Sequence, residues 1–513
     1  MKKLIATIFN RNFIIVLLLL LQIAFMGFTI WKARENYLLV SASITFLNIV
    51  LIIYIINKNE NPAYRIAWIV AIDIMPLFAG LAYLFIQMQF TKKIAVKLQN
   101  RSIEYSKNFL FQNSEVMHEI ESISPKTANL AHYINEFGPY PIYSKTNVEY
   151  FSLGELQFEA LISELKKANH FIFLEFFIIA KGHMFDTLTD ILIEKAKSGV
   201  EVRFMYDGIG AQINDPISNK TFKKLSESGI KLKCFNTFTP FLSTLQNNRD
   251  HRKIVVIDGN VAFTGGINIA DEYINLKERF GHWKDTGIML RGEAVWNYTV
   301  MFLQLWEINE VKVSNYEEFI PQYQVKGDYI ADGFVQPYSD TPMDNENVGE
   351  LIYMDIINNA EKYVFITTPY LILDNEFLTA LQFAAKKGVD VRIITPHIPD
   401  KWYVYMIAWR YYPKLIEAGV KIYEYTPGFI HSKSFVADDN TAVIGTINLD
   451  YRSFYLHYEC ACLLYNNSAV FDIKNDFIET MNISQQITME DCKKQSLRHK
   501  IAGGILNIFA PLL

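Results

Sequence analysis

Two short stretches of the chain combine a histidine, a lysine and an aspartate in the same order and at the same spacing. They read His251-Arg-Lys253-Ile-Val-Val-Ile-Asp258 and His431-Ser-Lys433-Ser-Phe-Val-Ala-Asp438. Because alternate residues of a strand face one side, the histidine and the lysine of each stretch are predicted to point the same way from one strand. A second apolar strand follows each stretch and ends in Gly-Gly-x-Asn268 or Gly-Thr-x-Asn448. A strand that only packs in a core needs none of these polar groups, whereas an enzyme that handles a phosphate can use all of them.

The two sets predict one phosphate-binding centre if the fold brings them together. The two lysines would supply positive charge, and the two asparagine carboxamides would donate hydrogen bonds to the anion. The two histidines would stand on opposite sides of it, so that one imidazole attacks a phosphodiester while the other protonates the leaving alcohol. Imidazole suits both tasks because its unperturbed pKa lies near neutrality. The pattern therefore predicts a phosphohistidine intermediate, and it leaves open which histidine attacks.

A carboxylate is expected to hold each ring in one tautomer. Asp285, in His282-Trp-Lys-Asp285, follows the first motif, and Glu459 follows the second. Asp258 lies beyond the strand from His251, so we expect it to brace the motif and Asp285 to orient that ring. The lysines would supply the charge stabilisation, and no separate cluster has metal-ligand spacing, so we expect neither a metal nor a cofactor.

The repetition of the motif makes it specific. A single His-x-Lys-x4-Asp match would be a weak signal, because three fixed positions arise by chance. Two matches at equivalent places in a duplicated unit, each followed by a glycine and an asparagine, are much stronger. The alternative, surface residues that form salt bridges on two homologous strands, leaves the glycines and asparagines unexplained.

The chain around the motifs is itself duplicated. Lys-Ser-Gly199-Val-Glu-Val-Arg-Phe-Met resembles Lys-Lys-Gly388-Val-Asp-Val-Arg-Ile-Ile, and Glu-Ser-Gly229-Ile-Lys-Leu resembles Glu-Ala-Gly419-Val-Lys-Ile. A helix and an apolar strand precede each copy, with the strands at 171–179 and 363–370. This alternation predicts an α/β fold of two duplicated units with pseudo-twofold symmetry, each with a largely parallel sheet covered by helices.

Three apolar runs precede the duplicated part, at residues 13–31, 37–57 and 66–90. Each is long enough for the roughly 18 to 20 residues that cross a bilayer as a helix, so we expect transmembrane helices there. The third run is interrupted only by Asp73 and Pro76. The largest basic cluster follows that run, so the positive-inside rule places the remaining chain in the cytoplasm and leaves the orientation of the N-terminus open.

The composition of the chain further limits the classes of protein to which it can belong. A chain of 513 residues predicts two or three compact units, and a net charge of -5 gives no general basic footprint for nucleic acid. The four cysteines are too few and too scattered for a disulfide framework or a zinc site. The tail is basic and then apolar, so it either lies on an anionic membrane surface or packs as a closing helix. The expected divisions are a membrane segment (1–95), a linker (96–145), a first half (146–325), a second half (326–490) and the tail (491–513).

The paired motifs resemble the HKD motifs of the phospholipase D superfamily, and within it the chain resembles bacterial cardiolipin synthases along nearly its whole length. The stretches that carry the resemblance are Asn61-Pro-Ala-Tyr-Arg-Ile-Ala-Trp68, His251 to Tyr273, His282-Trp-x-Asp285, Asn448-Leu-Asp-Tyr-Arg-Ser453 and Ala510-Pro-Leu-Leu513. Three positions depart from the family pattern. Thr446 replaces a serine, Leu373 replaces a proline, and His457 stands beside Glu459 where a smaller amide is usual, which we expect to alter the pairing around His431.

The resemblance implies two phospholipase D-like halves that convert two phosphatidylglycerols into cardiolipin and glycerol. It implies a multi-pass protein of the bacterial cell membrane, with phosphatidylglycerol as donor and acceptor, other membrane lipids as neighbours and no nucleic acid. A hydrolytic phospholipase D would share all six motif residues and the same intermediate, so the motifs leave that alternative open. A nuclease is disfavoured by the membrane segments and the absence of a basic face, and a scaffold by the intact motifs. The sequence does not indicate the oligomeric state.

Overall fold

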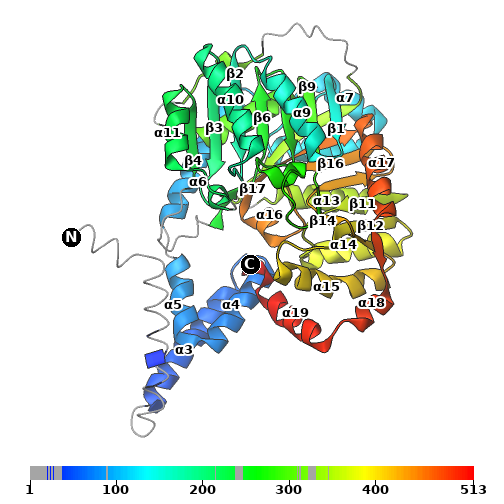
Figure 1. Cartoon of the computed structure of the whole chain (residues 1–513). Coiled ribbons are helices and arrows are strands. Elements are labelled where there is room, and N and C mark those ends of the chain that lie inside the picture. Colours follow the sequence, from blue (N-terminus) through cyan, green and yellow to red (C-terminus); the bar gives the residue numbers. More distant parts are fainter. Residues whose placement is uncertain are drawn as a thin grey trace, which may run out of the picture. The chain divides into compact units, whose positions relative to one another are not determined.

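A computed structural model of the chain describes residues 37–87, 90–213, 215–236, 247–308, 310, 313–321, 331–344 and 346–512, together with residues 20, 23, 24 and 27. The chain divides into two compact units. The first comprises residues 1–95, 238–248 and 504–513, and the second comprises residues 96–237 and 249–503. Both His-x-Lys motifs belong to the second unit, whose elements are labelled in Figure 1.

The first unit is helical in its described part. Its helices include α3 (Tyr37–Ile56), α4 (Pro62–Ile74) and α5 (Pro76–Gln87). The side chain of Asn61 caps α4 by accepting a hydrogen bond from the N–H of Ala63, and Pro62 begins the helix where a missing N–H costs nothing. The three helices pack on a small core that consists of Leu51, Ile55, Ile72, Ala79 and Tyr83.

The predicted membrane spans are not confirmed. The run 13–31 lies outside the described residues apart from four isolated positions, and the run 37–57 corresponds to α3. The prediction of one helix over 66–90 is wrong, because the chain breaks at Met75 between α4 and α5. Pro76 has no N–H with which to continue α4 and restricts the residue before it. Among the described residues, no helix is both long and apolar enough to cross a bilayer.

The second unit contains two sheets built on one plan. The strand order is β1-β9-β7-β6-β2-β3-β4 in the first sheet and β10-β17-β16-β15-β11-β12-β13-β18 in the second. The first seven positions of the two sheets correspond in the order that the duplication predicts. The first sheet consists of β1 (Thr146–Phe151), β2 (Phe171–Phe176), β3 (Glu201–Asp207), β4 (Lys231–Phe235), β6 (Ile254–Ile257), β7 (Val261–Gly265) and β9 (Gly287–Gly292). The second consists of β10 (Phe334–Asp340), β11 (Tyr363–Thr367), β12 (Asp390–Pro396), β13 (Lys421–Tyr425), β15 (Ser434–Ala437), β16 (Thr441–Gly445), β17 (His457–Tyr465) and β18 (Gln485–Ile487).

The prediction of largely parallel sheets is wrong. Within the first sheet only β2, β3 and β4 pair in parallel. Within the second, β11, β12 and β13 do so, as does the two-residue strand β5 with β17. The other ladders of the two sheets are antiparallel. Helical crossovers produce the parallel pairs, whereas the tight turns that join β6 to β7 and β15 to β16 force antiparallel pairing. Each half is therefore a mixed α/β sheet.

Helices cover the sheets and connect the halves. Figure 1 shows α9, α10 and α11 beside the first sheet and α13, α14 and α15 beside the second. Helix α12, at the end of the first half, packs on the first sheet and also contacts β10, while α17 packs on the second sheet and also contacts β1. The bounds of these helices are α9 (Gly154–Leu165), α10 (His183–Lys197), α11 (Asn219–Glu227), α12 (Val295–Trp306), α13 (Val348–Asn359), α14 (Asn375–Lys386), α15 (Trp402–Glu417) and α17 (Ala469–Asn482).

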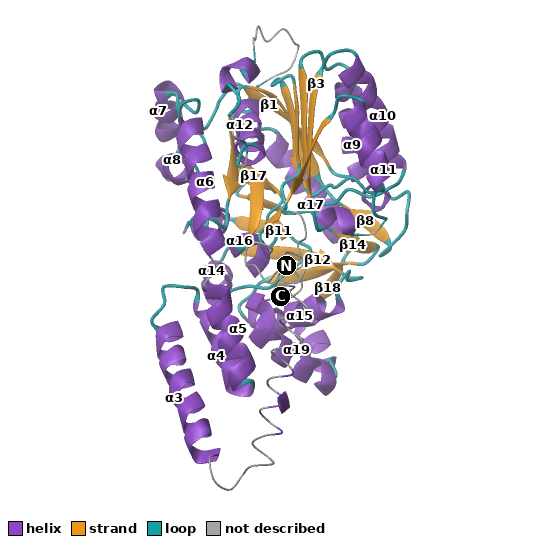
Figure 2. Cartoon of the chain, turned by 90° about the vertical axis from the view of Figure 1, so that its left-hand side faces the viewer, coloured by secondary structure: helices purple, strands orange, loops and turns teal. Residues whose placement is uncertain are grey.

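The segment predicted as a linker is helical. It contains part of α6 (Phe90–Lys107) and all of α7 (Ser114–Ile123) and α8 (Pro125–Phe137), the last two side by side in Figure 2. Val116, Ile120, Ala128 and Ala131 of these helices share a core with residues of the second half. The remaining elements are short or C-terminal: η1 (Gly210–Gln212), η3 (Asp271–Ile274), η4 (Tyr316–Phe319), α16 (Tyr451–Tyr455), α18 (Met489–Lys494), α19 (Leu497–Phe509) and η5 (Ala510–Leu512).

Candidate active site

Two short parallel pairings bring the motifs of the two halves together. Strand β5 (Arg249–Asp250) pairs with the start of β17, and the N–H of His251 donates to the carbonyl of Tyr458 at 2.9 Å. Strand β14 (Gly428–Ile430) pairs with β8 (His282–Lys284), and the N–H of His431 donates to the carbonyl of Lys284 at 2.7 Å. Each His-x-Lys segment thus follows a short strand that pairs with a strand of the other half, and strands β6 and β15 begin only after the lysine.

Because of these pairings, each motif histidine contacts a carboxylate that belongs to the other half. Nδ1 of His251 lies 2.9 Å from both carboxylate oxygens of Glu459, and Nδ1 of His431 lies 2.6 Å from Oδ2 of Asp285. The prediction that Asp285 orients the ring of His251 is therefore wrong: each histidine takes its carboxylate from the opposite half. The reason is topological, because β8 leads into Asp285 beside β14, while β17 carries Glu459 beside β5.

The two lysines belong to the same buried centre. Lys253 and Lys433 are 2% and 1% exposed, and each Nζ donates to the carbonyl of the histidine two residues earlier. Nζ of Lys433 also lies 2.8 Å from Nδ1 of His431. Burial lowers the pKa of Lys253 to about 8 and that of Lys433 to about 7, although Glu459 and Asp285 act in the opposite direction on both. Because Lys253 also lowers the pKa of His431 and of Lys433, the two motifs form one electrostatic site.

The two carboxylates differ in charge state. Burial raises the pKa of Asp285 to about 7, against the pull of Lys433 and Lys253. The pKa of Glu459 is lowered instead: burial works against its charge, but the hydrogen bond that Nδ1–H of His251 donates to the carboxylate outweighs that cost. Burial holds the pKa of both motif histidines well below the ordinary range, so both rings are neutral near pH 7. A neutral ring with its carboxylate at Nδ1 keeps Nε2 available for attack on a substrate or for proton transfer.

The motif aspartates brace the strands, as expected for Asp258. Asp258 has a left-handed backbone (φ 52°), and its carboxylate accepts hydrogen bonds from the N–H groups of Asn169, His170 and Phe171. Asp438 has the same φ of 52° and accepts from the N–H groups of residues 361, 362 and 363. Each aspartate therefore fixes the start of the central strand, β2 or β11, to the end of the motif strand. The described contacts of these two carboxylates do not include the histidines.

The two asparagines predicted to bind phosphate are buried but engaged differently. Oδ1 of Asn268 accepts from the N–H of Ile178, and its Nδ2 donates to the hydroxyl of Tyr273 at 2.7 Å. Oδ1 of Asn448 is buried without a hydrogen-bond partner. The ring of Tyr273 lies 5.5 Å from that of His431, so Asn268 reaches the site through this tyrosine.

Several contributors to the site were missed by sequence reasoning. The hydroxyl of Thr446 donates to Glu459, and at the equivalent place in the first half Gly266 leaves room for the Asp285 carboxylate, because a Cβ there would meet Oδ1 at 2.0 Å. Asp400 and Lys401 both influence the pKa of His431. They follow β12, and ligands commonly bind where strands of an α/β sheet end, so their position was the available signal.

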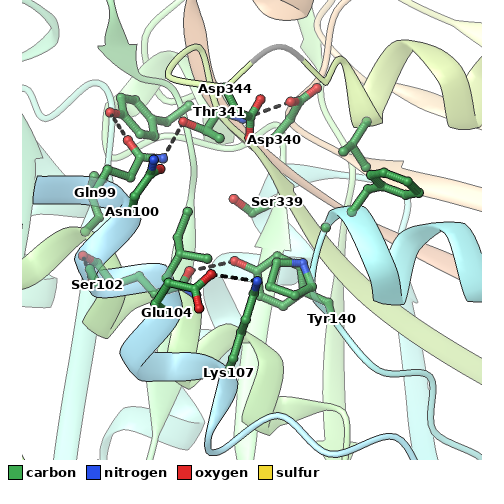
Figure 3. Close-up of a pocket in the computed structure, with 18 of the residues that line it drawn as sticks. Gln99, Asn100, Ser102, Glu104, Lys107, Tyr140, Ser339, Asp340, Thr341 and Asp344 are labelled. Carbon is green, nitrogen blue, oxygen red and sulfur yellow. Dashed lines mark hydrogen bonds and ion pairs between the residues drawn. The ribbon is translucent and has the colours of Figure 1, made fainter. Parts of the chain in front are cut away.

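The largest cavity among those described, about 370 Å³, is lined mainly by residues of α6, α12 and the end of β10 (Figure 3). Arg252 and Tyr458 line it, whereas their neighbours His251, Lys253 and Glu459 do not. Figure 3 shows its wall of polar side chains, with Glu104 paired to Lys107 at 2.8 Å. The cavity is thus on the opposite side of the chain from the imidazoles.

Binding of a phosphate diester is expected to take up protons at pH 8 and few at pH 6. Burial leaves Lys253 and Lys433 partly uncharged at pH 8, and a bound anion favours their charged forms. Calorimetric titration with dimethyl phosphate, repeated in buffers of different ionisation enthalpy, measures this uptake. Lys253→Met should reduce the uptake, and replacement of the exposed Lys197 by methionine should not change it. Equal uptake by all three proteins would contradict the assignment.

Comparisons with known proteins agree with this architecture. The family model described as "Cardiolipin synthase, PLD-like domain" matches residues 161–306 and 353–481, and a phospholipase D-nuclease N-terminal model matches residues 46–87. A cardiolipin synthase of Geobacillus sp. is 34% identical over 98% of this chain and 100% of its own length. Cardiolipin synthase 2 of Bacillus cereus is 34% identical over 89% of this chain and 88% of its own.

A solved structure shares the fold. The phosphatidylserine synthase of Haemophilus influenzae matches with a TM-score of 0.56 and 15% identity, over 75% of this chain and 98% of that one. At this identity the similarity concerns the fold alone. A protein of Streptococcus mutans that is described as uncharacterized is 46% identical over 90% of this chain and 99% of its own length.

Proposed function

Because the chain belongs to the cardiolipin synthase family of phospholipase D-like proteins, we propose that it transfers a phosphatidyl group from one phosphatidylglycerol to another. The products are cardiolipin and free glycerol. The observation that carries the proposal is the pairing of two buried neutral histidines, each with a carboxylate of the opposite half, around two lysines. This set provides a nucleophile, a proton donor and a charged cradle for one phosphodiester.

The reaction would proceed in two balanced steps. In the first, Nε2 of one neutral histidine forms a bond to phosphorus while the bond from phosphorus to the glycerol headgroup breaks. The other histidine, which takes up a proton when the anionic diester binds, gives its Nε2 proton to the departing oxygen. In the second, a headgroup hydroxyl of another phosphatidylglycerol returns a proton to that histidine and attacks phosphorus, so that the phosphorus–nitrogen bond breaks. Lys253 and Lys433 would balance the charge on the phosphoryl oxygens in both steps.

We also propose that the protein works at a membrane surface, where both substrates reside. Helix α19 exposes four apolar side chains at helical spacing, Leu497, Ile501, Ile505 and Ile508. Arg498 and Lys500 lie between them in sequence. An exposed apolar stripe beside basic residues favours an anionic lipid surface. The match of residues 46–87 to the N-terminal family model supports the same location.

Incubation of the reconstituted protein with phosphatidylglycerol alone tests the proposal. Cardiolipin and glycerol in equal amounts are expected. Phosphatidic acid and glycerol would identify a hydrolytic phospholipase D instead, because water would then have replaced the second lipid. Lipid mass spectrometry together with enzymatic assay of glycerol distinguishes the two outcomes.

A further inference from the structure

A third histidine stands beside the catalytic centre and has no role in the transfer described above. His457 is 9% exposed, and neither of its ring nitrogens has a hydrogen-bond partner in the described structure. Its Nδ1 lies 3.6 Å from Oε1 of Glu459, and its ring centroid lies 5.4 Å from that of His251. The sequence-based expectation that it would affect His431 is wrong, because Glu459 and His457 face the first motif. A buried imidazole with both nitrogens unused is costly unless it serves a partner.

We propose that His251, His457 and Glu459 form a binding site for a divalent transition-metal ion of the zinc type, and that the bound ion inhibits the enzyme. One ligand atom from each of these residues lies within 4.8 Å of the others, the closest such grouping among the described residues. Two imidazoles and a carboxylate are a common zinc ligand set in proteins. The sequence predicted no metal cluster, because these residues are separated by about two hundred positions and meet only through the pairing of β5 with β17.

The geometry needs a small adjustment to hold the ion. Donor atoms about 2.0 to 2.2 Å from one zinc ion stand roughly 3.3 to 3.5 Å apart. The 2.9 Å between Nδ1 of His251 and the Glu459 carboxylate must therefore open slightly, whereas the 3.6 Å between Nδ1 of His457 and the same carboxylate is already close to this spacing. His457 is free to rotate toward the ion without breaking a hydrogen bond. Glu459 brings negative charge, and Thr446 already holds its other oxygen.

The neighbouring groups determine the affinity of the site for a metal ion. His251, His457 and Glu459 are all buried, so few water molecules compete with the ion for these ligands. The ammonium of Lys253 interacts with both His251 and Glu459 and opposes a cation. Because Nδ1 of His251 faces Glu459, the ion would bind this nitrogen and force the ring proton onto Nε2, the atom needed for transfer, and this is the origin of the inhibition.

Zinc binding to the full-length protein in detergent, measured by equilibrium dialysis with zinc chloride and no lipid, tests the site directly. His457→Asn restores the smaller amide of the family pattern and is expected to weaken the binding of one zinc ion at least ten-fold. His118→Asn is the matched control. It makes the same change at another histidine beside a carboxylate, 3.8 Å from Glu121, but on an exposed surface, and it should bind zinc like the parent.

Inhibition supplies the second measurement. Each protein's transfer rate is followed against zinc concentration and expressed relative to its own metal-free rate. The concentration that halves the rate should rise at least ten-fold in His457→Asn and stay unchanged in His118→Asn. If His457→Asn fails to fold, as judged by circular dichroism, His457→Gln takes its place. Undiminished zinc binding by a folded His457 variant overturns the site, and because dialysis uses no lipid, this result is independent of which phospholipid is the substrate.

Discussion

Replacement of either His251 or His431 by alanine is expected to reduce phosphatidyl transfer by at least about a thousand-fold. One imidazole forms the bond to phosphorus and the other moves the proton, so neither step can proceed when one ring is missing. The double variant should be scarcely worse than either single variant, because residues that act as one unit are strongly non-additive. Both rings lie at the end of short loops rather than in the centre of the core, and we therefore expect the variants to fold.

The measurement is the formation of labelled cardiolipin in proteoliposomes, with thermal unfolding as the check on folding. His118→Ala, which removes an exposed imidazole outside the site, is the control and should keep the parent rate. Retention of more than about a hundredth of the rate by a His251 or His431 variant would rule out the two-histidine mechanism. Rapid quenching of the parent enzyme, followed by peptide mapping, identifies which ring carries the phosphatidyl group.

Sequence reasoning was most successful where the pattern was local and repeated. The two motifs, the alternation of helices and strands, and the bracing role of Asp258 all follow from short spacings. Strand β2 reads as an apolar run that is interrupted only by Glu175, and it is fully buried. A helix precedes each of the two predicted strands, α9 before β2 and α13 before β11.

It failed where the answer depended on pairing between distant segments. The sequence places Asp285 after the first motif and Glu459 after the second, and proximity along the chain wrongly assigned each carboxylate to its own half. The same limitation hid the approach of His457 to His251. The extent of parallel pairing was overestimated because the sequence indicates helical crossovers, whereas it does not indicate which strand an isolated apolar strand pairs with. Hydropathy alone predicts one helix over the third apolar run, whereas Pro76, which lacks an N–H, ends the first helix there.

Asp285→Asn and Glu459→Gln test the crossed assignment directly. Each substitution replaces the carboxylate that holds Nδ1–H of its histidine with a neutral amide, which can also donate and so stabilise the wrong tautomer. Such a change in a histidine–carboxylate pair costs about 10² to 10⁴ in turnover. Spectra of ¹⁵N-labelled histidine in the two variants show which ring changes its tautomer, once the signals are assigned with the single-histidine variants. Asp285→Asn should perturb His431 and leave His251 unchanged, and Glu459→Gln should do the reverse. The opposite pattern would restore the assignment of each carboxylate to its own half.

The same two variants should change stability in opposite directions, which separates charge effects from general damage. The folded pKa of Asp285, about 7, exceeds its unfolded value, so the folded protein binds more protons between about pH 4 and 7 and loses stability as the pH rises through that range. A neutral asparagine avoids this loss. The melting temperature of Asp285→Asn, relative to that of the parent, should therefore be higher at pH 8 than at pH 5. The folded pKa of Glu459 lies below its unfolded value, so its charge stabilises the fold above about pH 4.5, and Glu459→Gln should melt lower than the parent at pH 7.

The exposed pair Asp472→Asn and Glu149→Gln, which make the same chemical changes outside the site, should shift neither the melting temperature nor the rate. If both site variants were destabilised equally at pH 8, the two carboxylates would share one charge state, and the difference between the halves would have to arise from the histidines alone.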